Sequence, residues 1–334
     1  MKDFYIADAA KFENANVTSY FALSGMQVRE KKQGGQFLAL ILTDKTGSFD
    51  ARMWDDIADA AANCAEGSYV KVQGQVSKYQ GKFQITLTKM RLAAANEVDP
   101  ADYLPATRFD VEEMWAELRG YVSAFANADL KRLVFGFLDD EQIAAAYKTA
   151  PAAKMLHHAW LGGLLEHVLT LVRVCRATAP FYPEVDAELL ITGAILHDIG
   201  KIRELSWKNS FSYTLEGQMI GHISIAQGML LEKVRELEPF PAKLRVLVEH
   251  MILSHHGKYE FGSPKLPMTP EAVLLNVLDD LEAKMQAMRN EFARSEANGK
   301  GPGEMTEWVR SLERPVLDSQ AYLKDDSQAY LKDE

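Results

Sequence analysis

The sequence predicts a multidomain β plus α protein, in which a small β-barrel is followed by an all-α domain. Short alternating strands fill the first 95 residues, helical periodicity dominates from residue 111, and 334 residues is long for one hydrophobic core. We expect the barrel at residues 1–95, a linker and bridging helices at 96–150, the helical domain at 151–312 and an acidic tail at 313–334.

Five strands with one helix after the third predict the barrel. Three strands are expected at residues 20–29, 36–44 and 47–54, with "KQGGQ" and "TDKTG" as the turns between them. A short helix at 57–65 precedes two more strands within residues 68–93, which turn at "YQG". This order is the layout of an OB-fold barrel.

An OB-fold commonly binds single strands by stacking bases on aromatic side chains in a basic groove. Residues 1–95 carry 12 Lys and Arg against 10 Asp and Glu, although the whole chain has a net charge of −10. The local charge therefore permits a nucleic-acid partner. Alternatively, the aromatic side chains fill the barrel and the lysines keep it hydrated. The candidate contact residues are Phe21, Phe37, Trp54, Tyr79, Phe83, Arg29, Lys31, Lys32, Arg52, Lys78 and Lys82.

Composition favours a cytoplasmic protein. With 47% hydrophobic and 25% charged residues the chain is ordinary for a globular protein, and no apolar run approaches the roughly 18 residues of a membrane span. The first residues lack the apolar stretch of a secretory signal. Cys64 and Cys175 lie in different predicted domains, so we expect buried thiols rather than a disulfide.

Helices are expected from Val111 onward. The stretch "AAANEVDPADYLPATRFD" contains two prolines and no clear period, and is typical of a linker. After it, "VEEMWAELRGYVSAF", "ADLKRLVFGFLDD" and "EQIAAAYKTA" repeat apolar residues every three or four positions. Asp110 and Asn127 are the expected helix caps.

The stretch "AILHDIGKIREL" places His197 and Asp198 directly after an apolar helical run. An imidazole and a carboxylate are rarely buried without partners. One interpretation is a helix end, with His197 as a satisfied core histidine. The other is a metal site.

The distribution of histidine points to the second interpretation. All eight histidines fall between residues 157 and 256, whereas core histidines would be scattered along the chain. Most of them, with Asp279, stand at the edges of apolar stripes on different predicted helices. Helices packed around one centre would aim these side chains at a common transition metal.

The order H…HD…H…HH…D resembles the HD-domain metal-dependent phosphohydrolases. The longer strings "HHAWLGGLLEHVL", "LLITGAILHDIGKIREL", "YTLEGQMIGHI" and "HMILSHHGKYEFGSPKLP" are similar to one branch, the YhaM-like 3′–5′ exoribonucleases. That family pairs an N-terminal OB-fold with a C-terminal HD domain, and the resemblance covers about residues 5 to 290. This sequence departs from it at Asn276, where the family tends to have His, and at Glu282, where it tends to have Asp.

The resemblance implies a ligand set and a metal. It implies Mn²⁺, with Fe²⁺ or Co²⁺ as alternatives, since imidazole and carboxylate ligands suit these ions better than Mg²⁺. The first ion would be held by four core ligands and the second by three further histidines, with Asp198 bridging both. The implied metal ligands are His167, His197, Asp198 and Asp279 for the first ion, and His222, His255 and His256 for the second.

Other polar residues near these motifs keep two interpretations. Lys201 either reaches a substrate phosphate as a catalytic residue beside Asp198, or is an ordinary cation near a helix end. His157 and His158 either contact a nucleotide or buttress the helix that carries His167. We expect a structural role for His250.

The resulting prediction is an enzyme that shortens single-stranded RNA, with single-stranded DNA as an alternative substrate, from the 3′ end and releases nucleoside monophosphates. It needs no membrane, and a homo-oligomer is compatible with the sequence. The alternatives are an HD phosphohydrolase acting on a small or cyclic nucleotide, and a nucleic-acid-binding protein with a vestigial metal site. The tail repeats "SQAYLKDD" as "SQAYLKDE", and we expect an exposed helix or a disordered end without a catalytic role.

Overall fold

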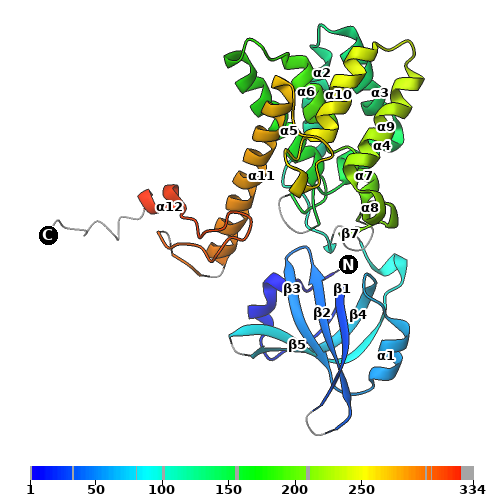
Figure 1. The fold of residues 1–334 in the computed structure, drawn as a ribbon. Helices are drawn as coiled ribbons and strands as arrows, with labels where there is room; N and C mark the ends of the chain where they lie inside the picture. Colours follow the sequence, from blue (N-terminus) through cyan, green and yellow to red (C-terminus); the bar gives the residue numbers. More distant parts are fainter. Residues whose placement is uncertain are drawn as a thin grey trace, which may run out of the picture.

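The computed structural model describes two hydrophobic cores, one in a β-barrel and one in a helical domain (Figure 1). It covers residues 2–31, 34–79, 81–99, 102–154, 158–207, 211–297, 299–301 and 303–324. Among the helices in these ranges, none has both the length and the apolar character needed to cross a bilayer. The predicted order, barrel first and helices second, is confirmed.

The barrel contains the five strands that were predicted, with the helix after the third. The strands close in the order β1-β2-β3-β5-β4, with β4 pairing back onto β1. Among the five strands only β3 and β5 pair in parallel, because a closed ring of five strands cannot alternate direction throughout. The bounds are β1 Asn16–Glu30, β2 Gln36–Asp44, β3 Gly47–Met53, α1 Ile57–Asn63, β4 Tyr69–Tyr79 and β5 Lys82–Leu92.

Strand β1 closes the barrel because it is long enough to pair on both sides. Residues 16–22 pair with β4 and residues 22–30 with β2, and the register shifts between Leu23 and Gly25. A second irregularity lies at Gln73 and Gly74 in β4. Such bulges increase local twist and bend a strand, which a five-stranded sheet needs in order to close.

The barrel interior consists of alternate residues of each strand, as the period of two requires. Phe21 is fully buried there and packs near the rings of Phe4 and Phe49. Its expected role in base stacking is therefore wrong, because no base can reach the ring. For this residue, the alternative that aromatic side chains fill the barrel is correct.

A buried ion pair attaches the N-terminal segment to the barrel. The Lys2 ammonium lies 3.2 Å from the Asp44 carboxylate and hydrogen-bonds the backbone oxygen of Tyr20. Asp44 also accepts hydrogen bonds from the backbone N–H groups of Ile6 and Thr46. Burial lowers the pKa of Lys2 to about 8 despite the neighbouring carboxylate. One buried carboxylate thus holds the ammonium and two backbone segments together.

The segment predicted as a linker connects the two cores and is partly packed. Asp102 accepts a hydrogen bond from the Tyr5 hydroxyl at 2.5 Å and pairs with Lys45 at 3.1 Å. Tyr103 is buried beside the Tyr69 ring. The described part of the segment therefore packs on the barrel surface. Its prolines and missing periodicity gave no sign of this packing in the sequence.

Eleven helices lie between residues 111 and 324 of the described chain. Asp110 and Asn127 accept hydrogen bonds from the backbone N–H groups of the first helical turn, as predicted. The bounds are α2 Val111–Ser123, α3 Ala128–Leu138, α4 Glu141–Thr149, α5 Gly163–Thr178, α6 Ala187–Leu196, α7 Lys201–Glu204, α8 Leu215–Ile220, α9 His222–Glu236, α10 Ala242–Ser254, α11 Pro270–Ala297 and α12 Ser319–Lys324.

Helix α6 lies at the centre of the helical core. Residues 189–196 are all buried, which is possible only for a helix enclosed by its neighbours. The contacting helices include α5, α10 and α11 (Figure 1). Because α6 ends at Leu196, His197 and Asp198 emerge in the middle of the bundle.

Two features of the helical domain lacked a signal in the sequence. A two-residue antiparallel ladder joins β6, Leu205–Ser206, to β7, Ser212–Tyr213, in a domain predicted to be all-α. Part of the predicted tail forms α12, and residues 325–334, which include the whole second octapeptide, lie outside the described residues.

We expect Asp44→Ala to destabilise the barrel by about 3–5 kcal/mol, because it leaves the Lys2 ammonium buried without its carboxylate. In calorimetry the barrel transition should fall by more than roughly 10 °C. Adding Lys2→Met should restore part of the loss, since no unpaired charge then remains. A double variant as unstable as Asp44→Ala alone would contradict this explanation.

Candidate metal centre and nucleic-acid surface

Three elements bring the first group of predicted ligands together. His167 comes from α5, His197 and Asp198 follow α6, and Asp279 comes from α11. The Nε2 atom of His167 lies 3.2 Å from Asp279 Oδ1, and that of His197 lies 3.2 Å from Asp198 Oδ2. Ligand atoms of His167, His197 and Asp279 lie within 4.8 Å of one another. The group is compact enough to surround one ion.

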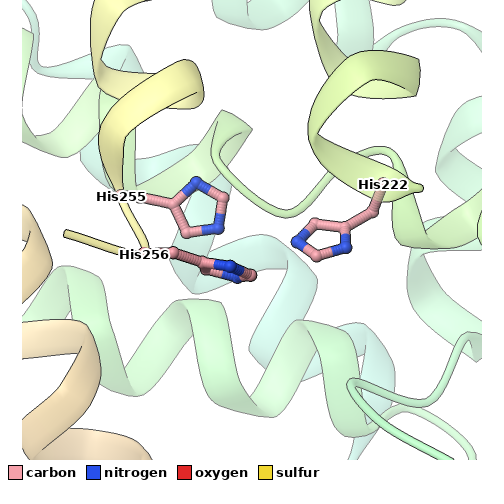
Figure 2. Close-up of side chains that lie close together, drawn as sticks. All are labelled: His222, His255 and His256. Carbon is pink, nitrogen blue, oxygen red and sulfur yellow. The ribbon is translucent and has the colours of Figure 1, made fainter. Parts of the chain in front are cut away.

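Three histidines form a second group beside the first. His222 begins α9, and His255 and His256 follow the end of α10 (Figure 2). One ring nitrogen from each lies within 4.8 Å of the others. His255 is buried, whereas His256 and His222 are more accessible. These side chains provide three imidazole donors at one point.

The Asp198 carboxylate stands between the two groups. Its Oδ2 faces His197 at 3.2 Å, while its Oδ1 lies 3.5 Å from His222 Nε2 and 3.8 Å from His255 Nε2. A carboxylate in this position can contact two adjacent ions, one through each oxygen. A plain helix end explains neither this position nor the four histidines within 4 Å of the carboxylate.

The orientation of each imidazole is set by a hydrogen bond at Nδ1. Each Nδ1 lies 2.6–3.1 Å from an oxygen acceptor, which assigns the proton to Nδ1 and leaves Nε2 as the donor to the centre. The acceptors are Glu282 for His167, the Ala194 oxygen for His197, Glu204 for His222, the Ile252 oxygen for His255 and the Phe261 oxygen for His256.

Several inward-facing atoms are buried and unsatisfied. Within the described part of the chain, Nε2 of His197, His222 and His255 and Oδ1 of Asp198 have no hydrogen-bond partner. Buried polar atoms of this kind are uncommon, since each carries an uncompensated desolvation cost. Divalent cations bound at the two groups would satisfy these four atoms, so the residues present fit a metal centre.

The charges of the centre differ between its two halves. Burial alone would lower the pKa of His167, but the Asp279 and Glu282 carboxylates raise it to about 10. Burial and neighbouring imidazoles instead hold the pKa of His255 well below its ordinary value. Burial likewise lowers the pKa of His256. The acidic half therefore attracts positive charge, and the other half keeps His255 and His256 neutral, as metal ligands must be.

Two glycines allow the backbone to approach this closely. A Cβ atom at Gly200 would collide with the carbonyl oxygen of His222, so only glycine lets the chain after Asp198 pass α9. Gly257 has φ +76°, and its missing side chain makes room for the Asn276 amide. That amide donates to the His255 carbonyl at 2.6 Å. Asn276 thus supports the turn that carries two of the histidines.

Lys201 begins α7, and its ammonium lies 2.6 Å from Asp198 Oδ2. Although burial lowers the pKa of this lysine, the Asp198 carboxylate raises it overall. Lys201 and His197 together hold the pKa of Asp198 well below its usual value, against the effect of burial. Lys201 is therefore charged and belongs to the centre. It is not an ordinary cation at the end of a long helix.

His158 supports the centre from outside. It is buried, and its Nε2 lies 2.8 Å from the Glu282 oxygen opposite the one that holds His167. Its backbone has φ +50°, a conformation that costs energy in a non-glycine residue. This placement fits the buttressing interpretation. His157 lies outside the described residues. His250 accepts a hydrogen bond from the Met268 N–H, in the structural role expected of it.

Two carboxylates that act on the histidines escaped the sequence prediction. Glu204 accepts hydrogen bonds from both the backbone and Nδ1 of His222. Glu282 was noted only as a departure from the family pattern. Both follow a site residue by three positions, Glu204 after Lys201 and Glu282 after Asp279, which places them one helical turn away. This three-residue spacing is the sequence signal that could have identified the two glutamates.

The predicted nucleic-acid contacts lie on the barrel surface in two sets. A cavity of about 440 Å³ on strands β1–β3 is lined by Arg29, Phe37 and Arg52 among others. The Phe37 ring stacks on Trp54 with centroids 4.5 Å apart. At the β4–β5 hairpin, the ammonium of Lys78 lies over the Phe83 ring.

The remaining predicted contacts join or flank these two sets. The Arg52 guanidinium lies 5.7 Å from the Tyr79 ring centroid and so links the cavity to the hairpin. Lys31 lies 5.9 Å from the Trp54 ring, and Lys82 is exposed at the hairpin. Lys32 lies outside the described residues.

Family comparisons agree with both parts of the chain. The HD domain family matches residues 164–284, and a family described as OB-fold nucleic acid binding domain matches residues 23–93. An HD domain is a divalent-metal-binding phosphohydrolase domain. The match therefore agrees with the grouping of histidines and carboxylates described above.

Curated relatives match along nearly the whole length. A protein of Bacillus velezensis named 3′-5′ exoribonuclease YhaM is 37% identical over 298 residues, which cover 89% of this chain and 92% of that one. Proteins of the same name from Geobacillus sp. and Halalkalibacterium halodurans are 35% and 32% identical, covering 91% and 88% of this chain and 93% and 90% of theirs. The chain therefore belongs to the YhaM family of 3′–5′ exoribonucleases.

Proposed function

We propose that this protein is a metal-dependent 3′–5′ exoribonuclease that hydrolyses single-stranded RNA to nucleoside monophosphates. The observation that carries the proposal is the Asp198 carboxylate, which faces His197 through one oxygen and His222 and His255 through the other. The names of the curated relatives and the OB-fold match support the substrate and the direction. Single-stranded DNA is a possible second substrate.

The residues divide into two ligand sets. His167, His197 and Asp279 would hold one ion, and Asp198 would bridge it to a second. The second ion would be held by His222, His255 and His256, which form the other compact group. Mixed imidazole and carboxylate donors favour Mn²⁺ over Mg²⁺, with Fe²⁺ or Co²⁺ as alternatives.

The surrounding residues prepare the centre for phosphodiester hydrolysis. Divalent ions held by these ligands would supply an activated water for the attack and stabilise the leaving oxygen. Lys201 holds Asp198 in position at 2.6 Å and presents positive charge beside the scissile phosphate. Glu204 and Glu282 keep the proton of His222 and His167 on Nδ1, so that Nε2 stays available.

The barrel would hold the strand while the helical domain cuts it. Phe37 and Trp54 offer a stacked aromatic surface, and Arg29 and Arg52 line the adjacent cavity. Both cysteines are buried free thiols, which suits the reducing cytoplasm where we place the enzyme.

The decisive assay uses a 5′-labelled single-stranded RNA with Mn²⁺ and compares Asp279→Asn with Asp139→Asn. Asp139 is an exposed residue that pairs with Arg119 and lies outside the metal centre. We expect a ladder that shortens from the 3′ end in the wild type, a loss greater than roughly 100-fold in Asp279→Asn, and near-normal activity in Asp139→Asn. Intact RNA with the wild type would refute the proposal and favour a small-nucleotide substrate.

Glu282→Gln tests the carboxylate that holds His167. The amide keeps the shape but removes the charge behind the imidazole, so the Mn²⁺ concentration for half-maximal activity should rise about 10–100-fold. Glu291→Gln, which removes a carboxylate farther along α11, is the control and should leave that concentration unchanged. An equal shift in both variants would mean that Glu282 acts only through general charge.

Trp54→Ala tests the barrel surface. Loss of one stacked base should raise KM for RNA by roughly tenfold, while kcat stays near the wild-type value. Phe181→Ala, which removes an exposed aromatic side chain from the helical domain, is the control. An unchanged KM in Trp54→Ala would exclude this surface from strand binding.

A further inference from the structure

The metal centre opens into one large cleft. The cleft has a volume of about 1250 Å³ and is lined at one end by Asp198, Lys201, His255 and Asp279. Its walls are α11 and the turn formed by residues 306–316, which follows α11 in the chain. Figure 1 shows the chain after α11 folding back beside this helix. Pockets for one small ligand are commonly about 300–1,000 Å³, so this cleft is larger than a mononucleotide needs.

The turn that forms the outer wall is a closed unit. The Thr306 N–H donates to the Val316 carbonyl, and the Val309 N–H donates to the Arg314 carbonyl. Thr306, Val309 and Val316 are buried, whereas Arg310 and Arg314 are exposed. The backbone is thus held at its base while two guanidinium groups remain accessible along the cleft.

Positive charge exceeds negative charge along the cleft once the ligand carboxylates are set aside. Apart from Lys201, which pairs with Asp198, the cationic lining residues are Lys258, Lys284, Arg310 and Arg314, against Asp280 and Glu313. Asp280 is already paired with Lys284 at 2.5 Å. Within the described part of the chain, neither Arg310 nor Arg314 forms an ion pair with a carboxylate. Two guanidinium groups without a carboxylate partner among the described residues therefore line a cleft that leads to the proposed phosphodiesterase centre.

The floor of the cleft is apolar. Val277, Leu281 and Met285 are exposed at four-residue intervals on α11, so they form one stripe along the cleft. The Phe261 ring is 61% exposed and also lines the cleft, close to the second histidine group. Apolar and aromatic surface for bases beside guanidinium groups for phosphates is the combination that holds a single strand.

We propose that this cleft binds the 3′-terminal nucleotides of the RNA, with Arg310 and Arg314 contacting phosphates on the 5′ side of the scissile bond. The inference rests on the proposed function and assigns the turn after α11 as the second wall of the substrate path. The two arginines are positioning residues. They bind the strand through its charge and do not take part in the chemistry.

The test compares Arg310→Ala/Arg314→Ala with Arg235→Ala/Lys243→Ala, which removes two positive charges from exposed positions outside the cleft lining. Each is assayed with single-stranded RNA and with bis(p-nitrophenyl) phosphate in Mn²⁺ at several KCl concentrations. In the first variant, KM for RNA should rise roughly tenfold or more. The slope of log(1/KM) against log[KCl] should become shallower by about 1.4, as expected for two lost phosphate contacts on a single strand.

Activity on the small phosphodiester should stay within about twofold of wild type in both variants, because it does not reach the turn. Arg310→Glu, which keeps Arg314 and its hydrogen bond to the Leu312 carbonyl, should raise KM for RNA further than Arg310→Ala. These results together would support the proposal.

Three results would overturn it. The cleft variant could match the control pair on RNA, or lose activity equally on both substrates, or change the sedimentation of the protein, which would mean that the turn contacts a second copy. These results all presuppose that the wild type shortens RNA. If it does not, the proposed function itself fails, and hydrolysis of the small phosphodiester distinguishes that failure from an inactive preparation.

Discussion

The helical domain is organised around one buried anion, the carboxylate of Asp198. A charge taken out of water requires compensation, and here the Lys201 ammonium and the facing imidazoles provide it. This requirement explains why the most apolar helix, α6, ends in the middle of the bundle and why the next residues turn sharply into α7. The same anion makes the centre attractive to divalent cations.

Hydrogen bonds at the Nδ1 atoms of the histidines stabilise the centre from the side that faces away from Asp198. Carbonyl groups hold His197, His255 and His256, while two glutamates, Glu204 and Glu282, hold the remaining imidazoles. A glutamate holds an imidazole more strongly than a backbone carbonyl does, because it adds a negative charge. The two glutamates also connect the centre to α7 and α11. The geometry at the metal therefore depends on residues that never touch it, which is common in metal enzymes.

The barrel and the helical domain suit different functions because their folds differ. A closed barrel presents its outer face without free edges and suits contact with an extended strand, whereas a bundle can aim several side chains at one interior point. The segment around Asp102 and Tyr103 docks on the barrel before the chain enters α2, so the two units are joined by packed structure. The cleft beside α11 leads from the protein surface to the centre.

The sequence by itself determined the five strands of the barrel, the first four helices and the caps at Asp110 and Asn127, because alternation, helical periodicity and capping act over a few residues. It also singled out the histidines, since their clustering is visible without a structure. Only the tertiary structure decided that Phe21 fills the barrel, that Glu204 and Glu282 orient the imidazoles, and that residues 306–316 form a wall of the cleft. These three features depend on contacts between residues far apart in the chain or on which side of a strand or helix faces inward. Local patterns carry no information about such pairings.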